Sequence, residues 1–337
     1  MPLRLQPTRP VYREIVREAL TFAWSERQLW PIALLAGILQ TAGVYDAVAT
    51  ALLKISLLQQ QSDWIQGSLQ ILGQAFQPPT SWSWAALAFW MARLQPLLWG
   101  CVIFFLVFTI SSIAQGALVQ AFATSTSNRL RSVRDACLAA ASRWPSLILL
   151  NLLSLFFLGL SRTWLFIPFG LSVSVPIAWV QTLFVLCLIA FGLFAIVVTS
   201  LHLFTLHFLM IREQSLSVAL ESAVKLFKRA WLLCAEIGLV LYVFGLIAVI
   251  GLSIGLVVLT IPLAILLVLL SVIGWVLPQE ILLLVSAGFL LVVGVCAFAY
   301  VVLFQYSTWY KLFRRVNQNA AVSKIQRMWM QLAAKKE

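Results

Sequence analysis

The chain alternates between long apolar stretches and short segments that carry the charges. No Asp, Glu, Lys or Arg occurs in residues 28–45, 94–128, 144–161, 163–211, 237–279 and 281–310. A helix needs roughly 20 apolar residues to cross a hydrocarbon core about 30 Å thick. Backbone inside lipid must be helical or closed into a barrel, and the alternation typical of barrel strands is absent from these stretches. The pattern therefore predicts an all-α, polytopic transmembrane helical bundle.

Composition agrees with this fold class. Hydrophobic residues make up 62% of the chain and charged residues 10%, whereas a soluble domain carries roughly 25% charged residues. We expect about six spans, near residues 29–48, 95–119, 144–160, 181–208, 231–254 and 284–308. The spans belong to a single integral membrane domain over residues 1–310, which begins with a cytoplasmic amphipathic helix at 1–28. A basic cytoplasmic tail follows at 311–337.

We attribute the net charge of +12 to the orientation of the chain in the membrane. We expect no nucleic-acid partner. With both termini in the cytoplasm, all Lys and Arg residues except Lys54, Arg93 and Arg162 lie in cytoplasmic segments. Cytoplasmic loops and helix flanks are enriched in Lys and Arg. The distribution therefore predicts a multi-pass protein with cytoplasmic N- and C-termini.

Residues 256–277 are also apolar enough to cross the membrane, but one more span would place the basic tail outside. We therefore expect a re-entrant or interfacial segment here, with Pro262 and Gly274 inside it. A seventh span is the alternative. Residues 164–179, which contain Pro168 and Pro176, are expected on the outer surface.

An amphipathic pattern recurs three times before a base, a tryptophan and a span. Apolar residues are spaced by four, three and four positions, which is typical of one face of a helix. The sets are Tyr12, Val16, Ala19 and Ala23; Val133, Cys137, Ala140 and Trp144; and Leu216, Leu220, Ala223 and Phe227. The sequence thus predicts three repeats of an amphipathic helix plus a transmembrane hairpin.

The base and tryptophan that follow each amphipathic stretch are expected to anchor a span at the cytoplasmic interface. A guanidinium stays at the headgroups and tryptophan prefers the interface, while proline is tolerated in the first helical turn. The anchors are Arg27 with Trp30, Arg143 with Trp144, and Arg229 with Trp231.

With "WPIALLAGILQTAGVYD" at residues 30–46 and "SLSVALESAVKLFKRAWLL" at 215–233, the three units resemble uncharacterised bacterial six-span integral membrane proteins. These are similar to the membrane domain attached to some glycerophosphoryl diester phosphodiesterases. The resemblance and the short loops imply a bacterial plasma (inner) membrane. The phosphodiesterase catalytic domain has no counterpart here, so the resemblance assigns no active-site residue.

The sequence contains no motif for an enzyme or a cofactor. It lacks a glycine-rich phosphate loop, a metalloprotease motif and a serine elbow. His202 and His207 are five residues apart, unlike the pair of a zinc helix. We therefore expect no enzyme activity, no metal site and no cofactor.

Four polar residues within the spans share one depth in the cytoplasmic leaflet. At about 1.5 Å per residue, they lie roughly 8–12 Å from the nearest basic flank; they are Glu236, Asn151, His207 and Gln305. Glu236 is expected either to stay protonated or to pair with a polar side chain of another helix, with His207 as the best candidate beside Asn151 and Gln305. The layer either joins helices in a structural or accessory membrane component, which we favour, or lines the path of a transporter or channel for a small molecule, ion or lipid.

The basic tail has its own amphipathic pattern. Val322, Ile325, Trp329 and Leu332 form an apolar stripe beside Lys324, Arg327 and Lys335. This arrangement predicts a helix on anionic lipid headgroups of the cytoplasmic face. A solvated tail is the alternative, and no protein partner is indicated.

Reporter fusions test the topology. Fusions after Ser127, Gln214 and Gln318 should report the cytoplasm, and fusions after Ser68 and Ser172 the outside, because the basic segments stay on the cytoplasmic side. An outside report after Gln318 would replace six spans by seven.

Overall fold

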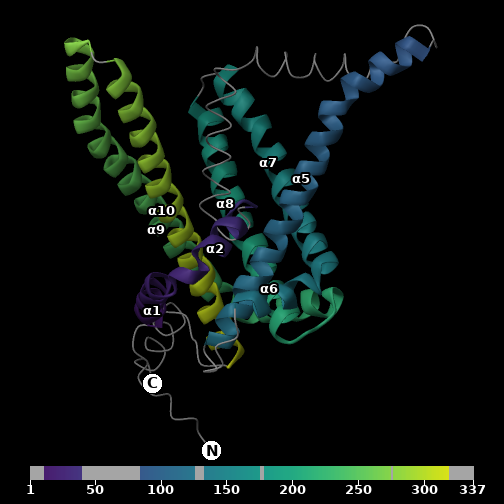
Figure 1. Ribbon diagram of the computed structural model, residues 1–337. Coiled ribbons are helices and arrows are strands. Elements are labelled where there is room, and N and C mark those ends of the chain that lie inside the picture. The colour runs from purple at the N-terminus through teal and green to yellow at the C-terminus, as the bar shows by residue number, and fades with distance from the viewer. Residues whose placement is uncertain (1–10, 40–83, 126–132, 175–177, 275, 319–337) are drawn as a thin grey trace, which may run out of the picture.

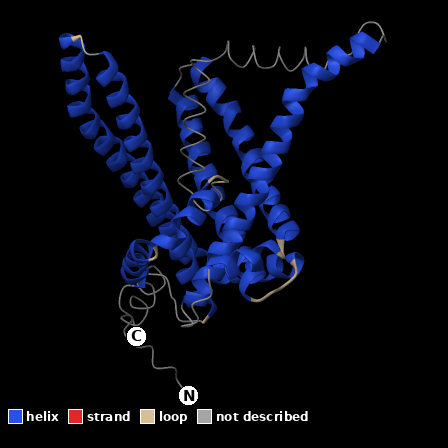
Figure 2. Cartoon of the chain, viewed as in Figure 1, coloured by secondary structure: helices blue, strands red, loops and turns tan. Residues whose placement is uncertain are grey.

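In the computed structural model, residues 11–39, 84–125, 133–174, 178–274 and 276–318 are described, and every regular element among them is a helix (Figure 2). The predicted all-helical class is confirmed for these residues. The elements are α1 (Val11–Ser25), η1 (Arg27–Leu29), α2 (Trp30–Gly37), α5 (Trp84–Ser125), α6 (Val133–Ala141), α7 (Trp144–Ser174), α8 (Ala178–Ile211), α9 (Leu216–Ile273) and α10 (Val276–Asn317).

Five described helices are long and apolar enough to cross a membrane. These candidate spans are Leu94–Thr124, Trp144–Leu165, Ala178–Ile211, Leu216–Ile273 and Glu280–Asn317. The first predicted span, residues 29–48, is described only as far as residue 39, within α2. The described helices are thus compatible with membrane insertion.

The long helices diverge from a common base (Figure 1). There α7 lies beside α8 and α9 lies beside α10, while α5 leans away on the opposite side. The short helices α1 and α6 lie at the base. Arg212 at the end of α8 donates to Asn317 at the end of α10 (3.0 Å), and Lys311 of α10 contacts Glu18 of α1 (2.9 Å). We call this the basic end of the bundle and the opposite one the far end.

The hydrophobic core occupies the half of the bundle next to the basic end. Its largest fully buried side chains include Phe122, Leu147, Phe204 and Trp309, from four different long helices. By contrast, α9 has no buried residue between positions 246 and 273. Apolar side chains exposed over such a length require an apolar environment. The far half is therefore the part of the molecule suited to lipid or to other membrane helices.

The amphipathic helices pack their apolar faces on this core. Ala19 and Ala23 of α1, Ala140 of α6, and Ala219 and Ala223 of α9 are fully buried. Small side chains let helix backbones approach closely. The apolar stripes therefore hold these helices against the protein, and their other faces remain available to solvent or headgroups.

Each predicted Arg–Trp anchor lies at a break in helical structure. η1 precedes α2, which begins at Trp30, and a turn at residues 142–143 precedes α7, which begins at Trp144. In α9 the backbone departs from helical geometry at Ala230 (φ −125°, ψ 21°). The three-fold repetition of whole units stays a prediction, since part of the first hairpin lies outside the described residues.

Residues 256–277 differ from the prediction of a re-entrant or interfacial segment. Up to Ile273 they continue α9 without reversal, and the chain turns at Gly274, whose φ of 76° is left-handed. Membrane helices tolerate an internal proline, so Pro262 does not end the helix. Residues 164–174 likewise continue α7, and their position at the outer surface stays a prediction.

Arg143 joins the start of α7 to the end of α8. Its Nη1 donates to the carbonyl oxygens of Leu209 (3.1 Å) and Gln214 (3.3 Å), and its Nη2 lies 3.6 Å from Glu213 Oε2. The last carbonyls of a helix lack intrahelical partners and attract a positive charge. The predicted position of this guanidinium is at the headgroups, and in the structure it also caps a helix.

Replacing Arg143 by Ala should therefore lower the free energy of unfolding by on the order of 1–2 kcal/mol, because it removes charged hydrogen bonds to two carbonyls. Thermal unfolding of the full chain in detergent measures this loss. Arg229→Ala is the control, since Arg229 also lies just before a tryptophan, two residues ahead of Trp231, but is exposed. Equal losses for the two variants would contradict the capping role.

Candidate functional site

Buried polar side chains gather in the half of the bundle next to the basic end. We call this set the polar layer. Its described members are Ser111, Ser112 and Gln115 of α5; Asn151 and Ser154 of α7; Thr199, Ser200, His202, Thr205 and His207 of α8; and Gln305, Ser307 and Thr308 of α10. Three of the four predicted residues belong to it, namely Asn151, His207 and Gln305, while Glu236 is half-buried on α9.

Many members of the polar layer bond to their own helix. The amide nitrogen of Asn151 donates to the Leu147 carbonyl (3.0 Å), and the hydroxyls of Ser112, Ser200, Thr205 and Thr308 each donate to the carbonyl four residues earlier at 2.7–2.8 Å. Such bonds satisfy a hydroxyl without a partner from another helix. Much of the layer can therefore be buried inside a tightly packed bundle.

One hydrogen bond of the layer links two long helices. Ser154 Oγ of α7 lies 2.7 Å from His202 Nδ1 of α8, and both side chains are buried. The sequence analysis did not select either residue for the layer. Counting from the basic ends of α7 and α8 places both about 14–15 Å into the bundle, deeper than the band of roughly 8–12 Å from which Asn151 was selected.

His207 is packed between aromatic rings of α10. Its ring stacks on Phe313 (centroid distance 4.9 Å) and on Tyr310 (5.7 Å), while Nδ1 bonds to the Leu203 carbonyl. Its Nε2 has no hydrogen-bond partner among the described residues. The predicted pairing of His207 with Glu236 is therefore wrong, because this histidine faces α10 and uses its other nitrogen on its own helix.

Four helices meet at Gly116, next to the layer. A Cβ built on this residue would lie 2.9 Å from Leu147 of α7, 3.2 Å from Ala140 of α6 and 3.3 Å from Met210 of α8. Ser112 precedes Gly116 by one turn and Asn151 follows Leu147 by one turn. Both therefore lie on the far side of the junction, where α5 and α7 approach each other.

Some buried polar atoms of this region have no hydrogen-bond partner among the described residues. They include Asn151 Oδ1, Thr199 Oγ1, His202 Nε2, His207 Nε2 and Trp309 Nε1. Buried polar groups in proteins normally bond to protein or to ordered water. These atoms could hold water or a small polar molecule by hydrogen bonding. The described residues bring no group of three or more His, Cys, Asp or Glu together for a metal ion.

The predicted anchors occupy different environments. Trp144 and Trp231 are exposed beside the basic end, as residues at a membrane interface would be. Trp30 is half-buried, and its indole nitrogen donates to the Ala23 carbonyl (3.0 Å). Arg27 lies over the Trp24 ring, 4.6 Å from its centroid. Trp30 and Arg27 thus contact the protein as well as any headgroups.

Comparison with protein-family models, with curated proteins and with solved structures finds no match for this chain. The resemblance to phosphodiesterase-attached membrane domains stays a prediction, and function has to be argued from the geometry above.

Proposed function

We propose that this protein is a non-catalytic structural or accessory component of a plasma membrane. Its packed half holds a set of helices whose apolar far halves contact lipid or the helices of partner proteins. The observation that carries the proposal is the contrast between the two halves. Polar side chains are buried near the basic end, whereas α9 has no buried residue between positions 246 and 273.

The polar layer supports this proposal because its contacts are those of helix packing. Helices in lipid gain little free energy from mutual burial of apolar side chains. Close backbone approach and polar contacts hold them together instead. The Ser154–His202 hydrogen bond connects α7 to α8, and the stacking of His207 on Phe313 connects α8 to α10. The layer thus joins three helices.

The basic end supports a six-span topology with both termini in the cytoplasm. Lys311 and Arg315 of α10 contact Glu18 and Glu14 of α1 at 2.9 and 3.2 Å. The first and last described helices therefore meet at one end, as an even number of crossings requires. Five candidate spans together with the predicted span at residues 29–48 make six, in three units of an amphipathic helix plus a hairpin.

A transporter or channel is the second candidate function. It is favoured by the buried atoms without partners, above all Asn151 Oδ1 and His202 Nε2. Intramembrane polar groups often mark the path of a solute or a proton. For this function, water would have to reach the polar layer.

A double-mutant cycle tests the packing role. Ser154→Ala and His202→Leu should each lower stability, and the double variant should lose less than the sum, with a coupling on the order of 0.6 kcal/mol. Thermal unfolding in detergent is the measurement. Thr163→Ala is the control, because Thr163 is an exposed residue of the same helix and should leave stability unchanged. Strictly additive losses would contradict a packing role for this pair.

Flux measurements in vesicles separate the two candidate functions. We expect vesicles that contain the full chain to pass protons and small solutes no faster than protein-free vesicles, because the layer is packed. His202→Gln and Glu236→Gln should then change nothing in flux. A flux that these variants abolish without lowering stability would replace the proposed function by the transporter.

A further inference from the structure

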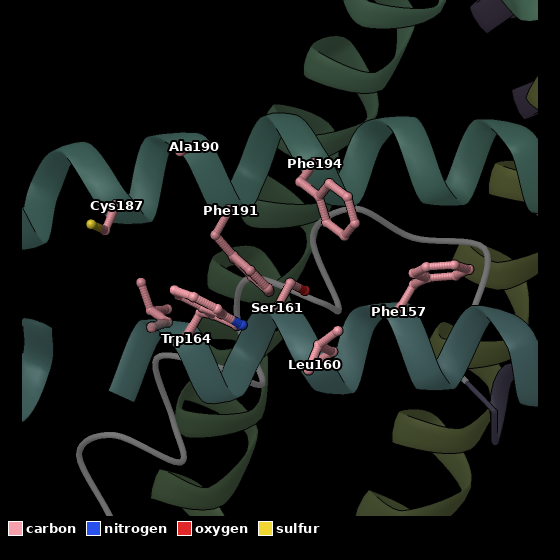
Figure 3. A pocket seen from close by; sticks show the side chains of 9 residues that line it. Phe157, Leu160, Ser161, Trp164, Cys187, Ala190, Phe191 and Phe194 are labelled. Atoms are coloured by element: carbon pink, nitrogen blue, oxygen red, sulfur yellow. The ribbon is translucent and has the colours of Figure 1, made fainter. Parts of the chain in front are cut away.

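The far halves of α7 and α8 flank an open hollow of about 370 Å³. Figure 3 shows side chains of α7 on one wall and of α8 on the other, with Phe191 and Trp164 pointing toward one another. The hollow is lined by Phe157, Leu160, Ser161, Trp164, Leu165, Cys187, Ala190, Phe191 and Phe194.

The hollow arises because small and large side chains are mismatched across the two helices. Phe191 and Leu165 are buried and form its floor, whereas Ala190 and Ser161 leave space beside them. Trp164, with 70% of its surface exposed, and Phe194, with 40%, stand at the rim. The opening therefore faces whatever surrounds the bundle.

The position of the hollow matches the outer part of a bilayer. Trp144 marks the basic end of α7, and at a rise of about 1.5 Å per residue Phe157 lies about 20 Å and Trp164 about 30 Å beyond it. The hydrocarbon core is about 30 Å thick, and tryptophan is enriched at both of its interfaces. Trp164 is thus placed at the outer headgroups, and the hollow extends from it into the hydrocarbon.

The lining indicates a hydrocarbon ligand. Ser161 is the one hydroxyl of the lining, and it donates to the Leu158 carbonyl of its own helix (2.9 Å). A volume of 370 Å³ lies near the lower end of ligand pockets, which span about 300–1,000 Å³. A membrane helix about 10–12 Å across is too wide to enter a hollow between two helices that pack on each other.

We propose that this hollow binds one acyl chain of an outer-leaflet lipid, with the lipid headgroup at the level of Trp164. The inference rests on the proposed transmembrane placement of α7 and α8, and it is independent of the packing role of the polar layer. Lipid in this hollow would be held at a fixed place, whereas lipid against the exposed far half of α9 would exchange freely.

The test uses the full chain in vesicles of phosphatidylethanolamine and phosphatidylglycerol with a small fraction of phospholipid that carries a diazirine in its acyl chain. After illumination, adducts are located by mass spectrometry of peptides. They should concentrate at residues 157–165 and 187–194. Ala190→Phe, which fills the hollow from α8, and Ser161→Phe, which fills it from α7, should each lower these adducts several-fold.

Ile189→Phe is the matched control, since Ile189 is the exposed neighbour of Ala190 and does not line the hollow. It should leave the adducts unchanged, and thermal unfolding should show that all three variants fold. Adducts of equal density along α9 and α10, or adducts that survive both filling variants, would overturn the proposal. Reporter fusions that place both ends of α7, or both ends of α8, on the same side of the membrane would instead refute the transmembrane placement.

Discussion

Helices in lipid are not pushed together by the hydrophobic effect, because lipid tails are as apolar as the side chains they would replace. The whole arrangement of this chain follows from that constraint. Where small residues and hydrogen-bonding groups are available, as at Gly116 and at the Ser154–His202 contact, the helices converge. Along α9 beyond Gly245 such contacts are missing, and no residue up to Ile273 is buried.

The charged side chains also hold helices together at the basic end, through a helix cap and ion pairs. Arg143 caps the end of α8, and Lys311 and Arg315 contact carboxylates of α1. Exposed ion pairs contribute little free energy, typically below about 1 kcal/mol each. The fully buried alanines of α1, α6 and α9 therefore do more to fix the amphipathic helices, and the ion pairs of Lys311 and Arg315 direct α1 to α10. The basic residues from which an orientation in the membrane is predicted thus also contact the helices at the base of the bundle.

The sequence was sufficient to predict features that depend on one helix at a time. Charge-free stretches predicted helices, and the Arg–Trp pairs predicted where helices α2 and α7 begin. Features that depend on rotation about a helix axis were not predictable. Counting residues placed His207 at the depth of Glu236, but depth says nothing about direction, and His207 points toward α10. The segment at 256–277 was predicted to be re-entrant or interfacial because a further span would have placed the basic tail outside. Charge counting does not locate a turn, and the chain stays helical past Pro262 up to Gly274.

The same constraint explains how a hollow can persist between α7 and α8. In a soluble core an empty space loses dispersion contacts, and the surrounding side chains relax to close it as far as packing allows. In a bilayer, acyl chains supply those dispersion contacts instead, so closing the hollow between α7 and α8 would gain little free energy. Phe157, Phe191 and Phe194 can then remain apart across Ala190 and Ser161 without loss of packing, provided that hydrocarbon occupies the space. On this argument a lipid chain is part of the packing of the far half, just as the Ser154–His202 hydrogen bond is part of the packing near the basic end.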